Sequence, residues 1–309
     1  MWIKKGLVFK VDDYRNQFIK SHASIPFAYH IEKNIFKIYF SSRNENGKSL
    51  PYYIDAIISE GNIKLTGEVV GPILELGRLG SFDDSGIMPS CLIKNKNQLY
   101  MYYIGWNPQV TVSYRLSIGL AISDDNGLSF KRYSEGPICD RNINEPYFNT
   151  APFVIIENNI WKMWYISCTG WEMINNYPEP SYHIKYAESN DGINWNRNGS
   201  ISVDYDERAQ ALGRPCVFKQ NDIYKMYFSY RKTNQYRISA LDGYKLGLAL
   251  SSDGIVWKKK YEDTGIELSD SAWDDHMMEY CHVFKHEGFI YMLYNGNDFG
   301  KEGFGYAIK

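Results

Sequence analysis

The sequence predicts an all-β fold, a five-bladed β-propeller with four antiparallel strands in each blade. Three observations support this prediction: prolines recur at a fixed interval, each is followed by two apolar runs joined by a polar turn, and a Ser-x-Asp-Gly pattern recurs further along the chain. Self-similarity at a fixed period indicates a repeat architecture, and repeated four-stranded units are typical of propeller blades.

The prolines mark the first strand of each predicted blade. Consecutive members of the series Pro26, Pro89, Pro152 and Pro215 are 63 residues apart, and one further step reaches Met278. After each point, a short apolar run and a polar turn precede a second run rich in aromatic residues: "IFKIYFSSR", "LYMYYIGW", "IWKMWYISC", "IYKMYFSYR" and "FIYMLYNGN". Pairs of apolar runs joined by such turns predict β-hairpins.

A second shared pattern ends the third strand, in "GLAISDDNGLSF", "KYAESNDGINW" and "GLALSSDGIVW". Asp-Gly supplies the positive φ that a tight turn needs, and an aromatic residue begins the next strand. Trp195 and Trp257 occupy this aromatic position, so we expect them to pack between blades. The predicted single domain, residues 1–309, divides into blades of approximately 17–75, 76–138, 139–204, 205–264, and 265–309 together with 1–10.

The last predicted blade needs an outer strand, because its third strand, "FGYAIK", is the final segment of the sequence. The N-terminal "MWIKKGLVF" resembles the outer strands "NWNRNG" and "VWKKKY". We therefore expect the N-terminal segment to close the last blade and to tie both ends of the sequence into one sheet.

Composition narrows the possible partners. The formal net charge is −2 and no basic run occurs, which argues against nucleic acid. No run of ~18 apolar residues occurs, so no membrane-spanning helix is expected, and the N-terminus lacks the apolar segment of a signal peptide. Five scattered cysteines favour reduced thiols in a cytoplasmic protein. The aromatic fraction of 16% supplies strand residues and flat platforms for sugar rings.

The geometry of an up-and-down blade predicts one polar pocket on the propeller axis, because the start of each first strand and the loop after each second strand lie on the same face. The first group of candidates precedes the proline positions: His22, Asp83, Asp84, Asn149, Thr150, Arg214 and Glu279, with Asp274, Asp275 and His276 just upstream of the last. The second group comes from the loops: Arg43, Trp106, Asn107, Trp171, Arg231, Asn295, Asn297 and Asp298. A polar cavity with aromatic walls would suit a carbohydrate.

The repeat and the "S-x-D-G-x-x-W" blade ending resemble the five-bladed propeller glycosidases, which include glycoside hydrolase families 32, 43, 68 and 130, over essentially the whole chain. The resemblance implies an axial pocket in which one carboxylic acid protonates the leaving oxygen and a second carboxylate activates water or attacks directly. The chain differs from those families in the first blade, where "SHASIP" offers His22 in place of an aspartate, and it lacks a recognisable Arg-Asp-Pro. The usual acids therefore cannot be transferred position by position.

Three carboxylates are the catalytic candidates. Asp84 is the expected base or nucleophile and Asp83 the residue that orients it, although both would also serve as turn residues that bind local backbone donors. Glu279 is the expected general acid, because apolar neighbours would raise its pKa by desolvation. Alternatively, Glu279 is a structural partner of Arg214.

The remaining candidates are expected to bind substrate. Arg214 would hold a carboxylate or phosphate of the ligand, or neutralise the acids. His22 would shuttle protons or serve as a structural histidine. Trp106 and Trp171 follow strand ends, where stacking on a sugar is favoured over core packing. His276 stands among acids without a second histidine at ligand spacing, so neither a metal nor a cofactor is expected.

The sequence thus predicts a carbohydrate-active enzyme, a glycosidase or related glycosyl-transferring enzyme, that acts on a small oligosaccharide, glycosyl phosphate or nucleotide-linked sugar. Two alternatives stay open. One is a non-catalytic sugar-binding propeller, favoured by the missing first-blade aspartate. The other is a glycoside phosphorylase in which Arg214, Arg231 or Arg43 holds phosphate.

Overall fold

The computed structural model describes residues 1–237 and 239–309, which form almost entirely β-structure. Four groups of four strands follow one another along the chain. They are β2 (Ser21–Glu32), β3 (Ile35–Arg43), β4 (Ser49–Ser59) and β5 (Asn62–Val70); β6 (Gly86–Asn95), β7 (Gln98–Pro108), β8 (Tyr114–Ser123) and β9 (Lys131–Arg132); β10 (Asn149–Glu157), β11 (Ile160–Ile174), β12 (Tyr177–Ser189) and β13 (Ile201–Val203); and β14 (Ala211–Gln220), β15 (Ile223–Arg231), β16 (Lys245–Ser251) and β17 (Lys258–Lys259).

A fifth group combines both ends of the described chain: β18 (Glu279–His286), β19 (Phe289–Asn295), β20 (Gly303–Ile308) and β1 (Ile3–Lys10). Short helical turns cover Val11–Tyr14, Tyr261–Asp263 and Asn297–Gly300 (α1). Within each group, neighbouring strands pair antiparallel. The predicted order of antiparallel strands within each unit is therefore confirmed.

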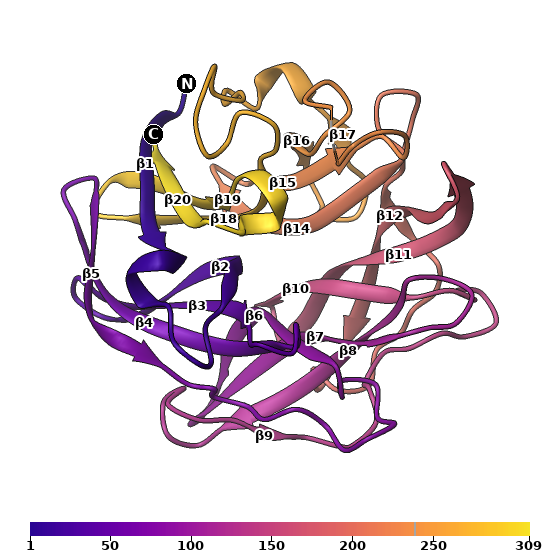
Figure 1. Ribbon diagram of the computed structural model, residues 1–309, viewed down its shortest axis with the longest axis horizontal. Coiled ribbons are helices and arrows are strands. Elements are labelled where there is room, and N and C mark those ends of the chain that lie inside the picture. Colours follow the sequence, from indigo (N-terminus) through magenta and orange to yellow (C-terminus); the bar gives the residue numbers. More distant parts are fainter. Residues whose placement is uncertain (238) are drawn as a thin grey trace.

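The first strands of the five groups meet in the middle of the molecule (Figure 1). β2 contacts β6, β6 contacts β10, β10 contacts β14, β14 contacts β18, and β18 contacts β2 again. Single parallel bridges, Ser49 to Gly86 and Tyr182 to Ala211, join the first group to the second and the third to the fourth. The cyclic order of contacts places the start of every first strand near a common centre.

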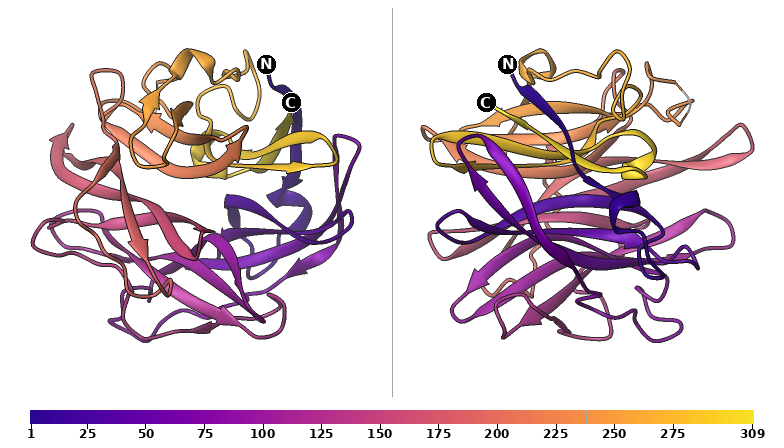
Figure 2. Two further views of the ribbon diagram at one scale, coloured as in Figure 1. Left: turned by 180° about the vertical axis from the view of Figure 1, so that it is seen from behind. Right: turned by 60° about the vertical axis from the view of Figure 1, so that its left-hand side comes forward.

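The N-terminal strand closes the last group, as predicted. β1 pairs with β20 from Ile3 opposite Ile308 to Lys10 opposite Gly303, and Figure 2 shows the two termini side by side. Trp2 extends this attachment, because its backbone N–H donates to the Gly265 carbonyl at 2.9 Å and its ring lies edge-on against Tyr227 of β15 in the fourth group. Both ends of the described chain are thus held in one sheet.

Each first strand carries an irregularity at or beside the proline position. The register shifts lie between Ser24 and Phe27, Pro89 and Cys91, Thr150 and Phe153, Gly213 and Cys216, and Glu279 and His282. Proline has no backbone N–H to donate, so within sheets it is tolerated at bulges. In β18, the first strand of the fifth group, the irregularity spans Tyr280 and Cys281. Cys281 therefore takes the place of the proline, and the predicted equivalence of Met278 is wrong by three residues.

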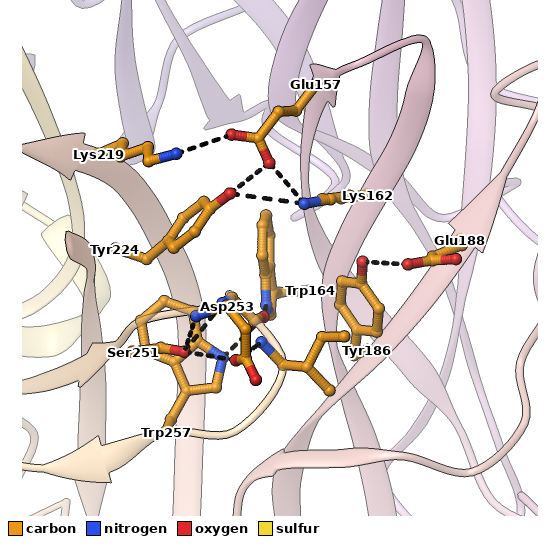
Figure 3. Close-up of polar contacts among 12 residues, drawn as sticks. Glu157, Lys162, Trp164, Tyr186, Glu188, Lys219, Tyr224, Ser251, Asp253 and Trp257 are labelled. Carbon is orange, nitrogen blue, oxygen red and sulfur yellow. Dashed lines mark hydrogen bonds and ion pairs between the residues drawn. The ribbon is translucent and has the colours of Figure 1, made fainter. Parts of the chain in front are cut away.

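The Ser-x-Asp-Gly turns form as predicted. In the fourth group, Ser251 Oγ accepts the Gly254 N–H at 2.9 Å, and Asp253 Oδ1 accepts the N–H groups of Ile255 and Val256 at 2.8 and 2.9 Å (Figure 3). These two backbone donors hold the pKa of Asp253 below its usual value. The local sequence thus closes the turn by itself.

The same turns also bind the neighbouring group. Trp164 on β11 donates its indole N–H to the Gly254 carbonyl at 2.8 Å, and Trp257 packs edge-on against Trp164 (Figure 3). The Tyr39 and Tyr102 hydroxyls make the corresponding bonds to the carbonyls of Gly127 and Gly192, at 3.1 and 2.7 Å. A central-strand aromatic of one group therefore anchors the turn of the next, three times in succession.

The expected packing of the repeat tryptophans is confirmed, since Trp195 lies edge-on against Tyr102 as Trp257 does against Trp164. All five cysteines are buried, and none of them forms a disulfide within the described residues. Among the described residues there is no helix long and apolar enough to span a membrane.

Candidate active site

A cavity of about 270 Å³ lies where the first strands converge, and all five groups contribute to its wall. Its floor comes from residues at or just before the irregularities of the first strands: Ser24, Ile25, Met88, Thr150, Ala151, Gly213, Arg214 and Tyr280. Three of these, Ile25, Ala151 and Tyr280, have left-handed backbone conformations with φ of 58°, 47° and 54°. Such a conformation is costly for side chains other than glycine, and it clusters at functional sites.

Aromatic side chains form most of the cavity wall. They are Trp106, Tyr114, Phe148, Tyr182, Tyr236, Tyr244, Tyr280 and Phe299. The hydroxyls of Tyr182 and Tyr244 are hydrogen-bonded to each other. Flat faces with hydroxyls at their rims suit a ligand that combines apolar ring faces with hydrogen-bonding edges.

Four arginines line the same cavity, from β3, β14, β15 and the loop after β15: Arg43, Arg214, Arg231 and Arg237. Arg214 is 1% exposed and donates to the backbone carbonyls of Tyr280, Cys281 and Ser90 at 2.8–2.9 Å. This set of acceptors fixes the guanidinium at the centre of the ring of first strands.

Arg231 is held by tyrosines. Its guanidinium lies 3.8 Å from the centre of the Tyr236 ring, and its Nε donates to the Tyr244 hydroxyl at 3.1 Å. Stacking of this kind suits a planar guanidinium, whose charge interacts with the face of the ring. Its remaining donors bind the backbone carbonyls of Lys232 and Pro180.

Arg237 and Glu179 are functional candidates that the sequence analysis missed. Arg237 Nε donates to Glu179 Oε1 at 3.2 Å, and the Tyr236 hydroxyl donates to Glu179 Oε2 at 3.0 Å. Arg237 and Tyr236 come from the long loop between β15 and β16, which lies outside the repeat pattern. The only signal was the charged and aromatic content of "TNQYRISALDGY".

Glu279 is fully buried, and neither of its carboxyl oxygens has a hydrogen-bond partner among the described residues. Burial raises the pKa of Glu279 well above its usual value, and the charges of Arg231 and Arg237 oppose this rise only in part. Glu279 occupies the strand position of Ser24 and Thr150, which line the cavity. Its own side chain is not part of the cavity wall, although the next residue, Tyr280, is.

Asp83 and Asp84 do not line the cavity. Asp83 is fully buried and accepts hydrogen bonds from Tyr103 and Arg132 at 3.0 and 2.8 Å. Asp84 accepts the Gly80 N–H at 2.8 Å and the Ser85 hydroxyl at 2.9 Å. Asp84 therefore has the turn role given above as its alternative, and Asp83 forms a buried ion pair.

Five of the predicted binding residues reach the cavity: Arg43, Trp106, Thr150, Arg214 and Arg231. Three predicted amides instead hold backbone or side-chain groups. Asn149 accepts from Arg197 at 2.7 Å, Asn295 accepts the Ile25 N–H at 2.8 Å, and Asn107 donates to the Ser81 carbonyl at 3.1 Å. Asn295 thereby stabilises the left-handed backbone conformation of Ile25.

The other predicted binding residues are not part of the cavity wall. Trp171 packs edge-on against Tyr114 and Phe148, two residues of the wall. Desolvation and the nearby Arg43 lower the pKa of His22 to about 4. Three more stand together at the start of α1, where Asn297 accepts the His276 N–H and donates to Asp275, and His276 bonds to Asp275. Of the two acids named beside them, Asp274 binds Lys4 and Tyr294, and Asp298 lies within α1.

No protein-family model matches the sequence. Two curated relatives from Mycobacterium tuberculosis, the uncharacterized proteins MT1551 (strain CDC 1551 / Oshkosh) and Rv1502 (strain ATCC 25618 / H37Rv), are each 33% identical over 308 residues. Each match covers 99% of this chain and 98% of the relative.

Solved structures with similar folds include glycoside hydrolases. One glycoside hydrolase matches 99% of this chain and 91% of its own, with a TM-score of 0.75 at 17% identity. A thermostable family-43 glycoside hydrolase matches 96% of this chain and 91% of its own, with a TM-score of 0.64 at 16% identity. A GH32 beta-fructofuranosidase from Bombyx mori matches 96% of this chain and 62% of its own, with a TM-score of 0.63 at 15% identity. The protein therefore belongs to the same family as the two mycobacterial proteins and shares its fold with these glycoside hydrolases.

Proposed function

We propose that the protein is a carbohydrate-active enzyme of the glycosidase type, a single domain of five propeller blades whose axial cavity takes a small sugar, a glycosyl phosphate or a nucleotide-linked sugar. The observation that carries this proposal is the aromatic-walled cavity at the convergence of the five first strands, with a buried, unpartnered carboxyl on Glu279, the residue before Tyr280 of the wall. The likeness of the fold to glycoside hydrolases supports it.

Glu279 is the proposed general acid. Desolvation raises the pKa of this carboxyl and so favours its protonated form, which can give a proton to a leaving oxygen. Glu179, held by Tyr236 and Arg237, is the second carboxylate next to the cavity wall and replaces Asp84 as the proposed base or nucleophile.

The test is a turnover screen of 4-nitrophenyl glycosides, glycosyl phosphates and nucleotide-linked sugars with the native protein and Glu279→Gln. We expect Glu279→Gln to lower kcat by about 100-fold or more, because general acid catalysis contributes at least that much. Glu207→Gln, an exposed exchange of the same kind, is the control and should keep native turnover. Full activity in Glu279→Gln would remove Glu279 from the mechanism.

A second candidate function is sugar binding without catalysis. It is favoured by one specific observation: among the described residues, none of those that line the cavity is an aspartate or a glutamate. Binding by the native protein and by Glu279→Gln, with no turnover by either, would support this alternative. Turnover that requires inorganic phosphate would instead favour a phosphorylase, with the arginines as the phosphate site.

A further inference from the structure

We propose that the ligand of this cavity is anionic: a sugar that carries an oxyanion, either phosphate or carboxylate, bound by Arg43 and Arg214 while its ring lies against the aromatic wall. This inference rests on the proposed function in one respect, namely that the cavity binds a sugar. It does not require that the sugar be cleaved.

The first argument is the charge of the wall. Four arginines line the cavity, no acidic side chain of the described residues does so, and Arg237 alone has an ion pair to a carboxylate, Glu179. Arg231 and Arg237 even flank the same ring, with their guanidinium centres 3.8 and 4.6 Å from the centre of Tyr236. Glu179 compensates Arg237, whereas Arg43, Arg214 and Arg231 have no ion pair among the described residues.

The second argument is burial. The side chains of Arg214 and Arg231 are 1% and 2% exposed, and the described residues offer them backbone carbonyls, a tyrosine hydroxyl and ring faces but no carboxylate within ion-pair distance. Buried charges in proteins are normally paired. Glu279 is a poor partner for them, because desolvation raises its pKa and disfavours its charged form.

The third argument is a set of free donors that point to a ligand. Arg214 Nε and Thr150 Oγ1 are buried and have no hydrogen-bond partner among the described residues, although both side chains line the cavity. The guanidinium of Arg43, also on the wall, makes no hydrogen bond to the described part of the chain. Guanidinium and hydroxyl donors converging without a protein acceptor match the geometry of a phosphate or carboxylate.

The aromatic wall specifies the rest of the ligand. A free inorganic anion would leave Trp106, Tyr114 and Phe148 in contact with water, whereas a sugar covers such faces with its C–H groups. A neutral sugar, in turn, would leave the buried guanidinium charges unpaired. A sugar that carries an anionic group would cover the aromatic faces and also pair the guanidinium charges.

The test is isothermal titration calorimetry of the full-length protein with matched probes, in which a neutral sugar is compared with the same sugar carrying one anionic group. Glucose is compared with glucose 1-phosphate and with glucuronic acid, galactose with galactose 1-phosphate and galacturonic acid, and UDP-glucose is added for larger conjugates. We expect the tightest binder to be anionic and to bind at least tenfold more tightly than its neutral counterpart. The better of the phosphate and carboxylate arms identifies the oxyanion.

Arg43→Gln is the test variant, because this side chain lines the cavity but is exposed and lies outside the apolar core. Loss of one charge-assisted hydrogen bond should weaken the anionic probe by about 10- to 100-fold and leave neutral probes unchanged. Arg141→Gln, an exposed arginine outside the cavity, should bind like the native protein.

Equal affinity for neutral and charged partners, or no binding of any anionic probe, would overturn the inference. So would an Arg43→Gln variant that weakens neutral and anionic sugars alike. These outcomes are separate from the failure of the proposed enzymatic function, because anionic selectivity without turnover would refute catalysis alone.

Discussion

Glu279 illustrates how position on a strand determines chemistry at the scale of one residue. Its neighbour Tyr280 takes a left-handed backbone conformation at the bulge, and the Tyr280 N–H donates to Ser229 Oγ at 2.9 Å. The Glu279 carboxyl is enclosed without a partner among the described residues, so desolvation dominates and the charged form is disfavoured. The desolvation that suits a general acid also lowers the free energy of unfolding at higher pH, where the charged form would be favoured in water.

Replacement of Glu279 with Gln should make the protein's stability less dependent on pH. The unfolded chain ionises Glu279 near its ordinary pKa, while in the folded chain desolvation raises the pKa and so favours the protonated form. Glu279 therefore makes its full contribution to the free energy of unfolding below the ordinary carboxyl pKa. That contribution is lost as the pH rises above this value. The loss amounts to at most about 1.4 kcal/mol per pH unit until the folded pKa is reached.

Urea denaturation of both proteins between about pH 5 and pH 8 measures this effect. The free energy of unfolding of Glu279→Gln relative to the native protein should increase with pH, whereas Glu207→Gln should follow the native curve. A difference that does not change with pH would show that the carboxyl is already ionised in the folded state.

At the scale of the element, the Ser-x-Asp-Gly turns form both local and long-range hydrogen bonds. Ser-x-Asp-Gly closes its own turn through the serine hydroxyl and the aspartate carboxylate, which is why the pattern can be recognised in the sequence. The glycine carbonyl then accepts a hydrogen bond from an aromatic residue 88 to 90 positions earlier in the chain, such as Trp164 for Gly254. One short motif therefore serves both a local and a long-range purpose.

Trp164→Phe should destabilise the protein by about 1–3 kcal/mol, because the buried Gly254 carbonyl loses one of its two indole donors and the smaller ring leaves space in the core. Trp257 donates to the same carbonyl at 3.0 Å but is only partly buried, so Trp257→Phe should cost less. Guanidinium chloride denaturation monitored by circular dichroism gives both values. A larger effect for Trp257→Phe would contradict the assigned role of Trp164.

The arrangement of the whole molecule depends on the pairing of its two ends. β1 completes the sheet of β18, β19 and β20, and it brings Phe9, which is fully buried, against Phe304 with ring centres 5.1 Å apart. Trp2 contributes a second anchor through its indole N–H to the Thr264 carbonyl at 3.1 Å. The closure therefore joins the fifth group to the fourth and keeps the cyclic order of first strands intact.

Deletion of residues 1–10 should destabilise the entire protein, although these residues lie outside the cavity wall. Removal of β1 exposes β20 as an unpaired edge and uncovers the apolar cluster around Phe9. We expect a lower Tm and loss of a single cooperative transition in thermal unfolding followed by circular dichroism. A point variant, Phe9→Ala, should keep the pairing and cost about 3–5 kcal/mol. Native-like unfolding of the deletion variant would contradict the closure.

The fold could be predicted because its signals are local and repeated. Alternating apolar runs, Asp-Gly turns and bulge prolines each determine structure within a few residues. Because the pattern recurs, the assignment of strands in one unit can be checked against the others. The one misplaced repeat position, Met278, arose because Cys281 replaces the proline and the interval from Pro215 to Cys281 is three residues longer than the regular 63. A spacing rule has no means of detecting such a change in loop length.

The sequence by itself determined the order of antiparallel strands, the turn chemistry, the attachment of the N-terminal strand and the ring of positions around the cavity. Only the tertiary structure decided which side chains of that ring enter the cavity. Asp83 turns to Arg132, a residue 49 positions away, whereas Glu179 and Arg237 meet from different strands and loops. Such choices depend on which partner is available for a buried charge in three dimensions, and the cost of leaving a charge unpaired outweighs any local preference.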